Sequence, residues 1–578
     1  MKSRRRAQEA GSMLLKYIQP SSVSRNNKNW FHSAVNTEPK VELHTGAAVV
    51  DNLRNSDGKG IAETVFNLYK NQETHMMNMS EIFTVIEKSG IRRSDPRLAT
   101  FLSKLSILHE HLGEKNTTLS NLHVDETTFC QLTEDNLVLL NQIVRNDIII
   151  PDWKSFTNQI TEMFNRCKDN QEGEVASYIP QLSRYNPDLW GMSICTIDGQ
   201  RFSLGDVNEK FTLQSCVKPF TYAICLSELG NEGVHKYIGQ EPSGRNFNDL
   251  SLDTSNKPHN PMLNAGAMMS CALILKKIFP CLGLAEKYDF LLNYLKRIAG
   301  GEFIGFNNSV FLSERENAYR NFAMAYYMQE NKCFPEGTDI HDCLDLYFQS
   351  CSLEVTSESL SVLGATLANG GICPITGENV LNASSVRDTL SLMYSCGMYN
   401  YSGQFAFKVG LPAKSGVSGC VLLVIPNLMA VALWSPPIDS IGNSERALQF
   451  CEELVEVYSF HRFENLNNLV SQKMDPRRQT HELKTLNTLT LLFSAVAGDV
   501  SSLHRHYLQG VDMTICDYDG RTALHLAAAE GRMHAVKFLL ETCRVPPSPQ
   551  DRWGHTPQEE AFRFGHDEVG RFFDNYLI

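Results

Sequence analysis

A repeat close to the C-terminus is the feature that most restricts how this chain can fold. Gly498-Asp499 recurs as Gly531-Arg532 and again as Gly565-His566, first 33 and then 34 residues apart. A unit of this period cannot bury its apolar face alone, and a stable core forms only when neighbouring units stack. The last part of the chain is therefore expected to be a short stack of about three units.

The repeat also carries a recognisable motif. Residues 517–528 (DYDGRTALHLAA) align with residues 551–557 (DRWGHTP). The aligned segments resemble the T-P-L-H-x-A unit of ankyrin repeats, whose period is about 33 residues. We assign residues 487–578 to ankyrin repeats. Two roles stay open for them, a surface that binds a protein partner and a cap that only stabilises the rest of the chain.

A chain of 578 residues is too long for this stack alone. Apolar residues at three- and four-residue spacing indicate a helical domain over residues 61–168. That region contains no D-x-D-x-D-G loop, so we expect no calcium site there. Residues 38–60 and 461–486 are polar and are predicted to be linkers.

The largest block, residues 172–460, mixes two kinds of pattern. Strand-like apolar runs cover residues 191–196, 421–425 and 429–434, and helix-like runs cover residues 218–229, 263–278 and 284–298. The two kinds do not alternate regularly, which favours an α+β fold. Pro426-Asn427 divides the longest apolar run, which predicts a tight turn between two strands and no membrane span.

The N-terminus differs in composition from the rest. Residues 1–37 are rich in serine and contain seven basic residues against the single acid Glu9. This pattern is typical of a mitochondrial transit peptide, and a disordered basic arm is the alternative. The sixteen cysteines form no C-x-x-C pair, so we expect reduced thiols. A net charge of −12 gives no reason to expect a nucleic-acid partner.

Ser215 and Lys218 form an S-x-x-K tetrad at the start of a helix-like run. At this spacing the two side chains share one face of a helix. Serine favours the N-cap position, so we expect the Ser215 hydroxyl at the positive end of the helix dipole. A buried, neutral Lys218 could take the hydroxyl proton and activate a nucleophile. An ordinary helix cap is the alternative, and Cys216 between them is expected only to pack.

A second motif lies about 200 residues later. Lys414-Ser415-Gly416 opens a strand-like run, and β-lactamases and penicillin-binding proteins pair S-x-x-K with a K-T-G strand. The S-D-N element of those enzymes has no clear copy here. A β-lactamase or peptidase therefore remains the weaker alternative, together with a non-catalytic ankyrin scaffold that has a decayed enzyme domain.

With these motifs the chain resembles the serine-dependent, β-lactamase-like glutaminases, and among them the animal mitochondrial forms of kidney and liver type. The matching strings are YIPQL (178–182), QSCVKP (214–219), KPHNPM (257–262), NAGA (264–267), SERE (313–316) and LANGG (367–371). The resemblance covers nearly the whole chain. It implies a β-lactamase/transpeptidase-like catalytic domain, an EF-hand-like helical domain and an ankyrin tail.

The resemblance also implies an activity and a site. The reaction would be hydrolysis of L-glutamine to L-glutamate and ammonia. Ser215 would be the nucleophile, Lys218 the base, Tyr399 a proton relay and Tyr178 a second catalytic tyrosine. The implied substrate-binding set is Ser215, Asn264, Glu314, Asn321, Tyr347, Tyr399 and Val417, with backbone N–H groups of Ser215 and Val417 facing the oxyanion. Without the resemblance, Tyr347 could equally well be a core aromatic, and Glu314 could be a solvated charge on a helix.

Further expectations come from the resemblance alone. It implies a homotetramer that can extend into filaments, no metal or other cofactor, activation by inorganic phosphate and a place in the mitochondrial matrix. Ser251 stands where the kidney-type form carries an aromatic residue and the liver-type form carries serine. Inhibitor response and loop-mediated regulation are therefore not carried over from the kidney-type form.

Overall fold

The computed structural model describes residues 58–71, 73–112, 118–244, 249–464, 473–478 and 481–576. The predicted leader, residues 1–37, and most of the predicted linker at 38–60 lie outside the described residues. The chain divides into two compact units. Of the described residues, the first unit contains 155–475, and the second combines 58–154 with those from 476 onwards.

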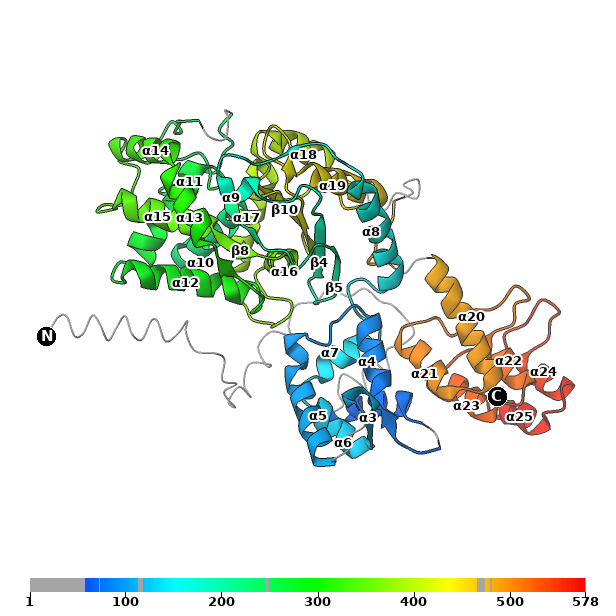
Figure 1. Cartoon of the computed structure of the whole chain (residues 1–578). Helices are drawn as coiled ribbons and strands as arrows, with labels where there is room; N and C mark the ends of the chain where they lie inside the picture. Colours follow the sequence, from blue (N-terminus) through cyan, green and yellow to red (C-terminus); the bar gives the residue numbers. More distant parts are fainter. Residues whose placement is uncertain are drawn as a thin grey trace. The chain divides into compact units, whose positions relative to one another are not determined.

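The first unit is built on an antiparallel sheet of five strands in the order β5-β4-β11-β10-β9 (Figure 1). The strands are β4 (Gly191–Thr196), β5 (Arg201–Gly205), β9 (Ala413–Gly416), β10 (Cys420–Ile425) and β11 (Met429–Trp434). Every residue of β4, β10 and β11 is buried, which explains why these strands appear in the sequence as unbroken apolar runs. All three predicted strands are confirmed. Asn427 takes a left-handed φ of 60° in the predicted turn between β10 and β11.

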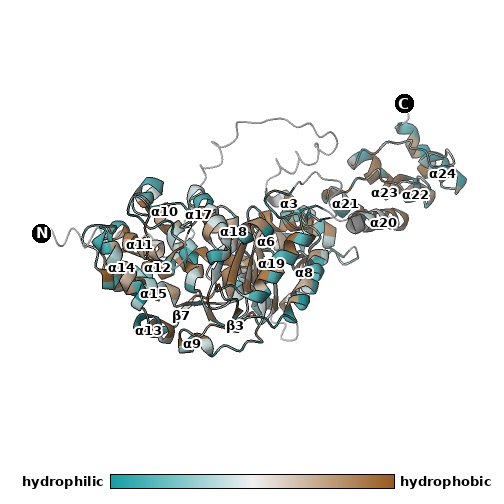
Figure 2. Ribbon diagram, turned by 90° about the horizontal axis from the view of Figure 1, so that it is seen from above, coloured by the Kyte–Doolittle hydropathy of each residue, from teal (hydrophilic) through white to brown (hydrophobic). Residues whose placement is uncertain are grey.

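Helices cover both faces of this sheet. Helix α16 (Ser357–Ala368) packs on β4, β10 and β11, while α8 (Trp153–Lys168) and α19 (Glu445–Val457) lie on the other side (Figure 1). The Trp190 ring, just before β4, stacks on Phe164 of α8 with centroids 5.0 Å apart. Figure 2 shows hydrophobic strands in the interior beside α8 and α19.

A lobe of helices adjoins the sheet. Its members include α10 (Lys218–His235), α11 (Asn264–Leu273), α12 (Leu284–Ile298), α13 (Asn308–Glu316), α14 (Tyr319–Glu330), α15 (Ile340–Cys351) and α17 (Ala383–Cys396). Helix α10 packs on both α11 and α17 and is buried from Lys218 to Leu226. Gly230, with φ 72°, interrupts its regular geometry, one residue after the predicted end of the helix. The three predicted helical runs are confirmed, and the second continues from α11 as a π-turn over Ile274–Ile278.

The second unit begins with a small helical region. Its elements are α3 (Gly58–Tyr69), α4 (Met79–Lys88), α5 (Ala99–Leu112), α6 (Glu126–Thr133) and α7 (Leu137–Val144), with a short ribbon of β1 (Met77–Asn78) and β2 (His123–Val124). Buried phenylalanine rings from four helices fill its core, among them Phe66 and Phe129 with centroids 5.9 Å apart. Helix α8, which the sequence pattern placed with these helices, belongs from Ser155 onwards to the first unit. There Arg166 pairs with Glu453 at 2.8 Å.

Three helix pairs form the C-terminal part of the second unit. They are α20 (His481–Ala497) with α21 (Val500–Leu508), α22 (Ala523–Ala529) with α23 (Met533–Lys537), and α24 (Pro557–Arg563) with α25 (Asp567–Phe572). Thr522 and Thr556 cap α22 and α24 by accepting backbone N–H groups. His525 contacts Thr522 Oγ1 at 3.0 Å and the His555 carbonyl of the next repeat at 3.1 Å. The T-x-x-H motif of this repeat thus ties it to the next repeat.

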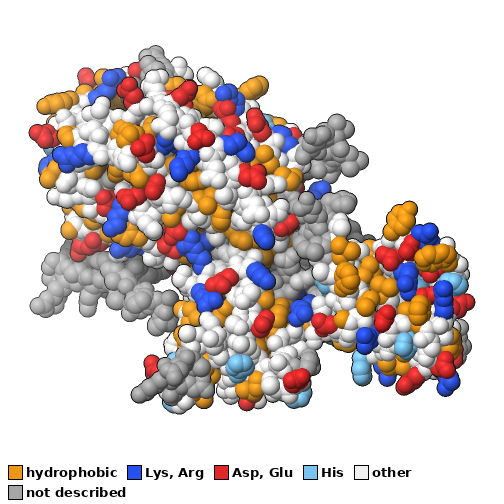
Figure 3. Space-filling model, turned by 45° about the vertical axis from the view of Figure 1, so that its right-hand side comes forward, with side chains coloured by type: hydrophobic (Ala, Val, Ile, Leu, Met, Phe, Trp, Pro, Cys, Tyr) orange, Lys and Arg blue, Asp and Glu red, His pale blue; other side chains and the backbone are white. Residues whose placement is uncertain are grey.

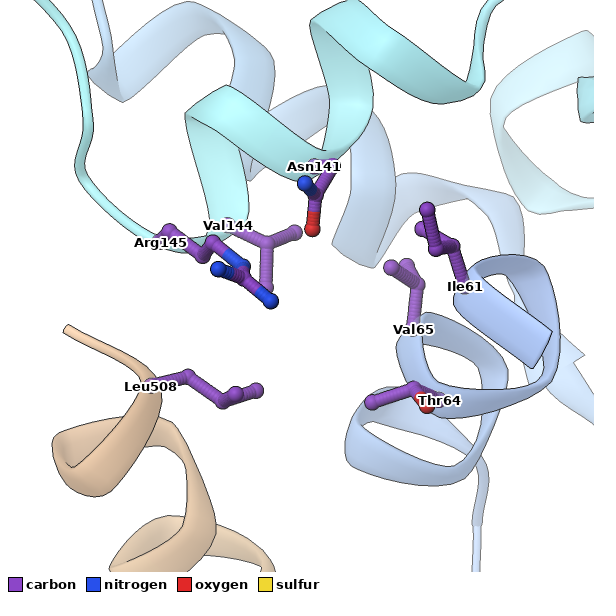
Figure 4. A pocket seen from close by; sticks show the side chains of 7 residues that line it. All are labelled: Ile61, Thr64, Val65, Asn141, Val144, Arg145 and Leu508. Atoms are coloured by element: carbon purple, nitrogen blue, oxygen red, sulfur yellow. The ribbon is translucent and has the colours of Figure 1, made fainter. Parts of the chain in front are cut away.

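The two regions of the second unit are in contact. Arg505 of α21 donates to the Leu68 carbonyl of α3 at 2.9 Å and lies over the Tyr69 ring. Leu508 closes one side of a small, largely apolar pocket (Figure 4). The other residues that line the pocket are Ile61, Thr64, Val65, Asn141, Val144 and Arg145. The N-terminal helical region and the first ankyrin helix pair therefore share a core.

The surface carries both signs of charge. On the face shown in Figure 3, the described Lys and Arg side chains are interspersed with Asp and Glu. Among the helices that the structure describes, none is long and apolar enough to cross a membrane.

Candidate active site

Ser215 lies in a 3-10 turn, η3 (Gln214–Val217), which runs directly into α10. The Lys218 backbone N–H donates to the Ser215 carbonyl. The expected N-cap role is wrong, because Val217 occupies the N-cap position of α10 and makes no side-chain cap bond. The shared face is retained, since residues i and i+3 eclipse each other in a 3-10 turn.

Two residues beside Ser215 have an unusual backbone conformation. Gln214 has a φ of 48° and Tyr399 a φ of 53°. Positive φ is uncommon outside glycine and costs on the order of 1–3 kcal/mol, so it persists only where the surroundings impose it. Such residues cluster at active sites. The sequence does not mark Gln214 as a site residue, because a φ value leaves no trace in the residue pattern.

The exposure pattern shows where a substrate could reach the chain. Within residues 211–226, all of which the structure describes, Ser215 alone is partly exposed. Within residues 411–425, Val417 alone is partly exposed, in the turn between β9 and β10. The turn that carries Ser215 packs against β9. The two backbone N–H donors expected at the oxyanion thus come from adjoining segments.

Lys218 has the chemistry required of a general base. Its side chain is 1% exposed, and Nζ donates to Asn264 Oδ1 at 2.7 Å and to the Met262 carbonyl at 3.3 Å. Burial, and after it the positive charge of Lys414, lowers the pKa of Lys218 to about 7. A large fraction of Lys218 is therefore neutral near pH 7. Asn264 continues the network by donating to Asn321 Oδ1 at 3.2 Å.

Lys414 is a second buried lysine at the site. Its Nζ donates to the carbonyls of Gly397 at 3.0 Å and Ser415 at 2.7 Å, and lies 4.6 Å from the Tyr399 ring centroid. Burial lowers its pKa to about 8. In the sequence, Lys414 marked only the start of a strand. Its effect on Lys218 depends on spatial proximity, which the sequence does not reveal.

Tyr399 opens the turn η5 (Tyr399–Tyr401) and is buried. Burial raises the pKa of its hydroxyl, and a hydrogen bond with the Ser215 side chain acts in the opposite sense. The preceding Gly397 explains how this turn fits against β9. A Cβ on Gly397 would lie 1.8 Å from the Ala413 carbonyl oxygen, so only glycine allows this approach.

Tyr178 and Glu314 form another wall of the candidate site. The Tyr178 ring is half exposed, but its hydroxyl points inward and donates to Glu314 Oε1 at 2.5 Å. Burial of that hydroxyl, and then the charge of Glu314, raises the pKa of Tyr178. Burial also raises the pKa of Glu314, while hydrogen bonds from Tyr178 and Gln214 act in the opposite direction. Glu314, on α13, is therefore not a freely solvated helix charge.

Tyr347 has features of both roles left open by the sequence, a core aromatic and a substrate-binding residue. It is buried on α15, as a core aromatic would be. Its hydroxyl nevertheless hydrogen-bonds to the Cys351 thiol, and burial followed by the charge of Cys351 and of Glu314 raises its pKa. The polar end of Tyr347 thus faces the same region as Glu314.

The structure brings all the candidate residues together. Val417 joins them through Gly442, where an added Cβ would lie 3.3 Å from the Tyr399 ring and 3.6 Å from Val417 Cγ1. Over the described part of the chain, no group of three or more His, Cys, Asp or Glu side chains could hold a metal ion. The site therefore offers a partly exposed hydroxyl, a buried lysine base, a buried phenol and a carboxylate around one position.

Three family models match successive parts of the chain. A glutaminase model matches residues 173–463, an EF-hand domain model matches residues 61–151, and a model of three ankyrin repeats matches residues 491–573. The predicted classes of all three regions are confirmed.

Individual relatives agree with these matches. The mouse (Mus musculus) liver isoform of glutaminase, named mitochondrial, is 51% identical over 499 residues, which are 86% of this chain and 81% of the relative. A glutaminase of the cyanobacterium Nostoc is 44% identical over 306 residues, which are 53% of this chain and 89% of the relative. A solved structure named "Probable glutaminase ybaS" aligns with a TM-score of 0.51 at 31% identity, covering 54% of this chain and all of that chain.

Proposed function

The chain belongs to the glutaminase family and hydrolyses the side-chain amide of L-glutamine to give L-glutamate, and from this premise we propose that the reaction passes through an acyl-enzyme on Ser215. The observation that carries the proposal is the state of Lys218. It lies one turn from a partly exposed serine, is fully enclosed, and has a pKa lowered to about 7.

In the first half-reaction, Lys218 Nζ accepts the proton of Ser215 Oγ as the oxygen attacks the amide carbon of glutamine. The carbonyl oxygen becomes an oxyanion, which accepts hydrogen bonds from the backbone N–H groups of Ser215 and Val417. One such donor typically contributes about 3 kcal/mol to the transition state. Tyr399, which hydrogen-bonds to Ser215, delivers a proton to the leaving nitrogen, and ammonia departs.

The second half-reaction reverses these roles. Water enters where ammonia left and attacks the γ-glutamyl ester on Ser215. Tyr399 takes a proton from the water, which restores its hydroxyl. Lys218 returns to Ser215 Oγ the proton that it accepted in the first half-reaction. Glutamate is then released, and the serine hydroxyl is restored.

The walls of the site suit the charges of glutamine. Glu314 faces the α-ammonium group of glutamine. Burial disfavours the ionised form of this carboxylate, and the positive charge of the ammonium group stabilises that form again. Asn264, Asn321 and Tyr347 supply amide and hydroxyl donors for the α-carboxylate and the side-chain amide. Tyr178 holds Glu314 in place through its 2.5 Å hydrogen bond.

Replacement of the nucleophile tests the mechanism. We expect Ser215→Ala to abolish ammonia release from glutamine while leaving the thermal unfolding midpoint unchanged, and we expect full activity from Ser391→Ala, at an exposed serine of α17. Wild-type protein quenched during turnover should carry a γ-glutamyl group on the peptide that contains Ser215. Retained turnover in Ser215→Ala would refute the mechanism. Asparagine and a chromogenic β-lactam, assayed in parallel, would reveal the alternative hydrolase activities.

We also propose a mitochondrial location for this chain. The mouse and rat relatives at 51% identity are both named mitochondrial, and residues 1–37 have the composition of a transit peptide. Fractionation of cells that express the full chain, and the same chain without residues 1–37, tests this. Retention of the shortened chain in the mitochondrial fraction would contradict the leader assignment.

Assembly and activation are further proposals that rest on the family resemblance. We propose a homotetramer that can extend into filaments, activation by inorganic phosphate without a metal or other cofactor, and an ankyrin tail that binds a protein partner. Light scattering with and without phosphate, combined with an ammonia assay of the metal-free enzyme, tests the first two. A monomeric, phosphate-insensitive enzyme would contradict both.

A further inference from the structure

Two thiols that the catalytic mechanism does not use lie directly behind the nucleophile. The Sγ atoms of Cys216 and Cys420 are 3.2 Å apart, and both residues are fully buried. Cys216 follows Ser215 in the 3-10 turn, and Cys420 begins β10 three residues after Val417. The pair therefore joins the turn of the nucleophile to the turn that carries the second oxyanion donor.

The surroundings hold the two sulfurs in contact. Cys216 Sγ lies 3.2 Å from the Lys414 carbonyl, and Cys420 Sγ lies 3.7 Å from the Leu213 carbonyl. Gly416, directly opposite Cys420 in the β9–β10 register, leaves the space that they fill. A Cβ on Gly416 would lie 2.7 Å from Cys420 Sγ and 3.3 Å from Cys216 Sγ. The third residue of the Lys414-Ser415-Gly416 motif thus makes room for both thiols.

The surroundings of the pair make the two thiols unequal. Burial, the largest influence, opposes ionisation of Cys420, but its hydrogen bonds with Cys216 and Ser418, together with the charge of Lys414, hold its pKa below the ordinary value. Burial raises the pKa of Cys216. Of the two thiols in contact, Cys420 therefore loses its proton more readily, and it is the one expected to react first with an oxidant.

We propose that Cys216 and Cys420 form an oxidative modification site, at which a peroxide converts the two thiols into a disulfide that lowers glutaminase activity. The Cys420 sulfur attacks one peroxide oxygen, the O–O bond breaks, and the departing hydroxide leaves as water with the proton of the Cys420 thiol. The Cys216 sulfur then displaces hydroxide from the sulfenic acid, and that hydroxide leaves as a second water with the Cys216 proton. Two thiols are oxidised, and hydrogen peroxide is reduced to two molecules of water.

The disulfide affects catalysis through the position of Ser215. A disulfide bond is about 2.05 Å long, so the two sulfurs must approach by about 1 Å. This movement draws Cys216, and with it the neighbouring nucleophile, towards β10. A misplacement of about 1 Å can reduce turnover by about 10²-fold. Reduction of the disulfide by a dithiol reverses the displacement.

The test uses the full-length enzyme and hydrogen peroxide. We expect peptides containing Cys216 and Cys420 to become linked, as seen by mass spectrometry without reduction, while ammonia release falls at least tenfold and returns after treatment with dithiothreitol. Cys216→Ser and Cys420→Ser should each keep their own initial rate through the same treatment. Cys396→Ser, at a partly exposed thiol near Lys414, and Cys451→Ser, at a buried thiol on α19, should remain sensitive.

Several results would overturn the proposal. One is a loss of activity without the linked peptides, and another is a link that leaves the rate unchanged. A third is protection by Cys396→Ser with continued sensitivity of Cys420→Ser. The link is read by mass and needs no turnover, so Ser215→Ala should still form it. A failure of the acyl-enzyme mechanism is therefore distinguishable from a failure of this site.

Discussion

Two turns in this molecule share one sequence pattern and use it differently. Thr522 and His525 in the ankyrin stack, like Ser215 and Lys218 in the glutaminase unit, place a hydroxyl three residues before a basic side chain. Thr522 caps its helix and bonds to His525, which also reaches the next repeat. Ser215 caps nothing, and the groups around it come from residues 264, 399 and 414.

The difference shows what turns a hydroxyl–base pair into a catalyst. Burial lowers the pKa of both bases, so neutrality alone does not separate them. In the ankyrin turn both ring nitrogens of His525 are already engaged, and Thr522 is buried. In the glutaminase unit the hydroxyl of Ser215 is partly exposed beside Lys218. Access to a reactant, and not the spacing, distinguishes the two turns.

The largest expected effect comes from removing the base. Lys218→Met keeps an unbranched side chain in the buried position but cannot accept a proton, so we expect kcat to fall by about 10³-fold. Steady-state ammonia release measures this. Lys236→Met, at an exposed lysine at the end of α10, is the matched control and should have wild-type activity. A Lys218→Met enzyme within tenfold of wild type would place the base elsewhere.

The next effect is a shift in pH dependence. In the proposed mechanism the neutral form of Lys218 is the base, so activity should rise with pH through about 7, the pKa of Lys218. Lys414 lowers that pKa by charge repulsion, so Lys414→Met should raise it and move the acidic limb upward, by on the order of one pH unit. Lys414→Arg keeps the charge and should leave the limb in place. Identical limbs in both variants would exclude the repulsion.

The ankyrin turn should respond in stability and not in catalysis. Thr522→Ala removes an N-cap, which typically costs about 1 kcal/mol. We expect amide hydrogen exchange over 522–529 to accelerate accordingly, while kcat stays at the wild-type value. Thr514→Ala, at an exposed threonine of the same stack, serves as the comparison. A fall in kcat from Thr522→Ala would mean that the two turns are coupled.

The smallest effect concerns the contact inside the second unit. Arg505→Ala removes the hydrogen bond to the Leu68 carbonyl and the contact with the Tyr69 ring. We expect faster hydrogen exchange in α3, by the equivalent of about 1 kcal/mol. Arg571→Ala, at an exposed arginine of α25, should leave α3 unchanged. Unchanged exchange in both variants would show that α3 is stable without the ankyrin contact.

The sequence predicted the parts whose signal is local. Strands β10 and β11 and helix α12 have long apolar patterns, and the ankyrin turns repeat their own capping residues. The N-cap expectation for Ser215 failed because packing against β9 and Tyr399 imposes a 3-10 turn there. The charge of Lys414 and the strained φ of Gln214 depend on neighbours distant in sequence. Such features become visible only when the fold brings those neighbours together.

Strand β9 lies at the edge of the five-stranded sheet, where unpaired backbone groups could recruit a strand from another molecule. Here the outer edge is occupied, because the Ser415 N–H donates to the Gly397 carbonyl at 3.2 Å and the turn of Ser215 packs on the same strand. The segments that carry the proposed catalytic residues also shield this edge from intermolecular pairing. Variants that loosen the turn should therefore show aggregation as well as lost activity, and solubility becomes a second measure of whether the site is assembled.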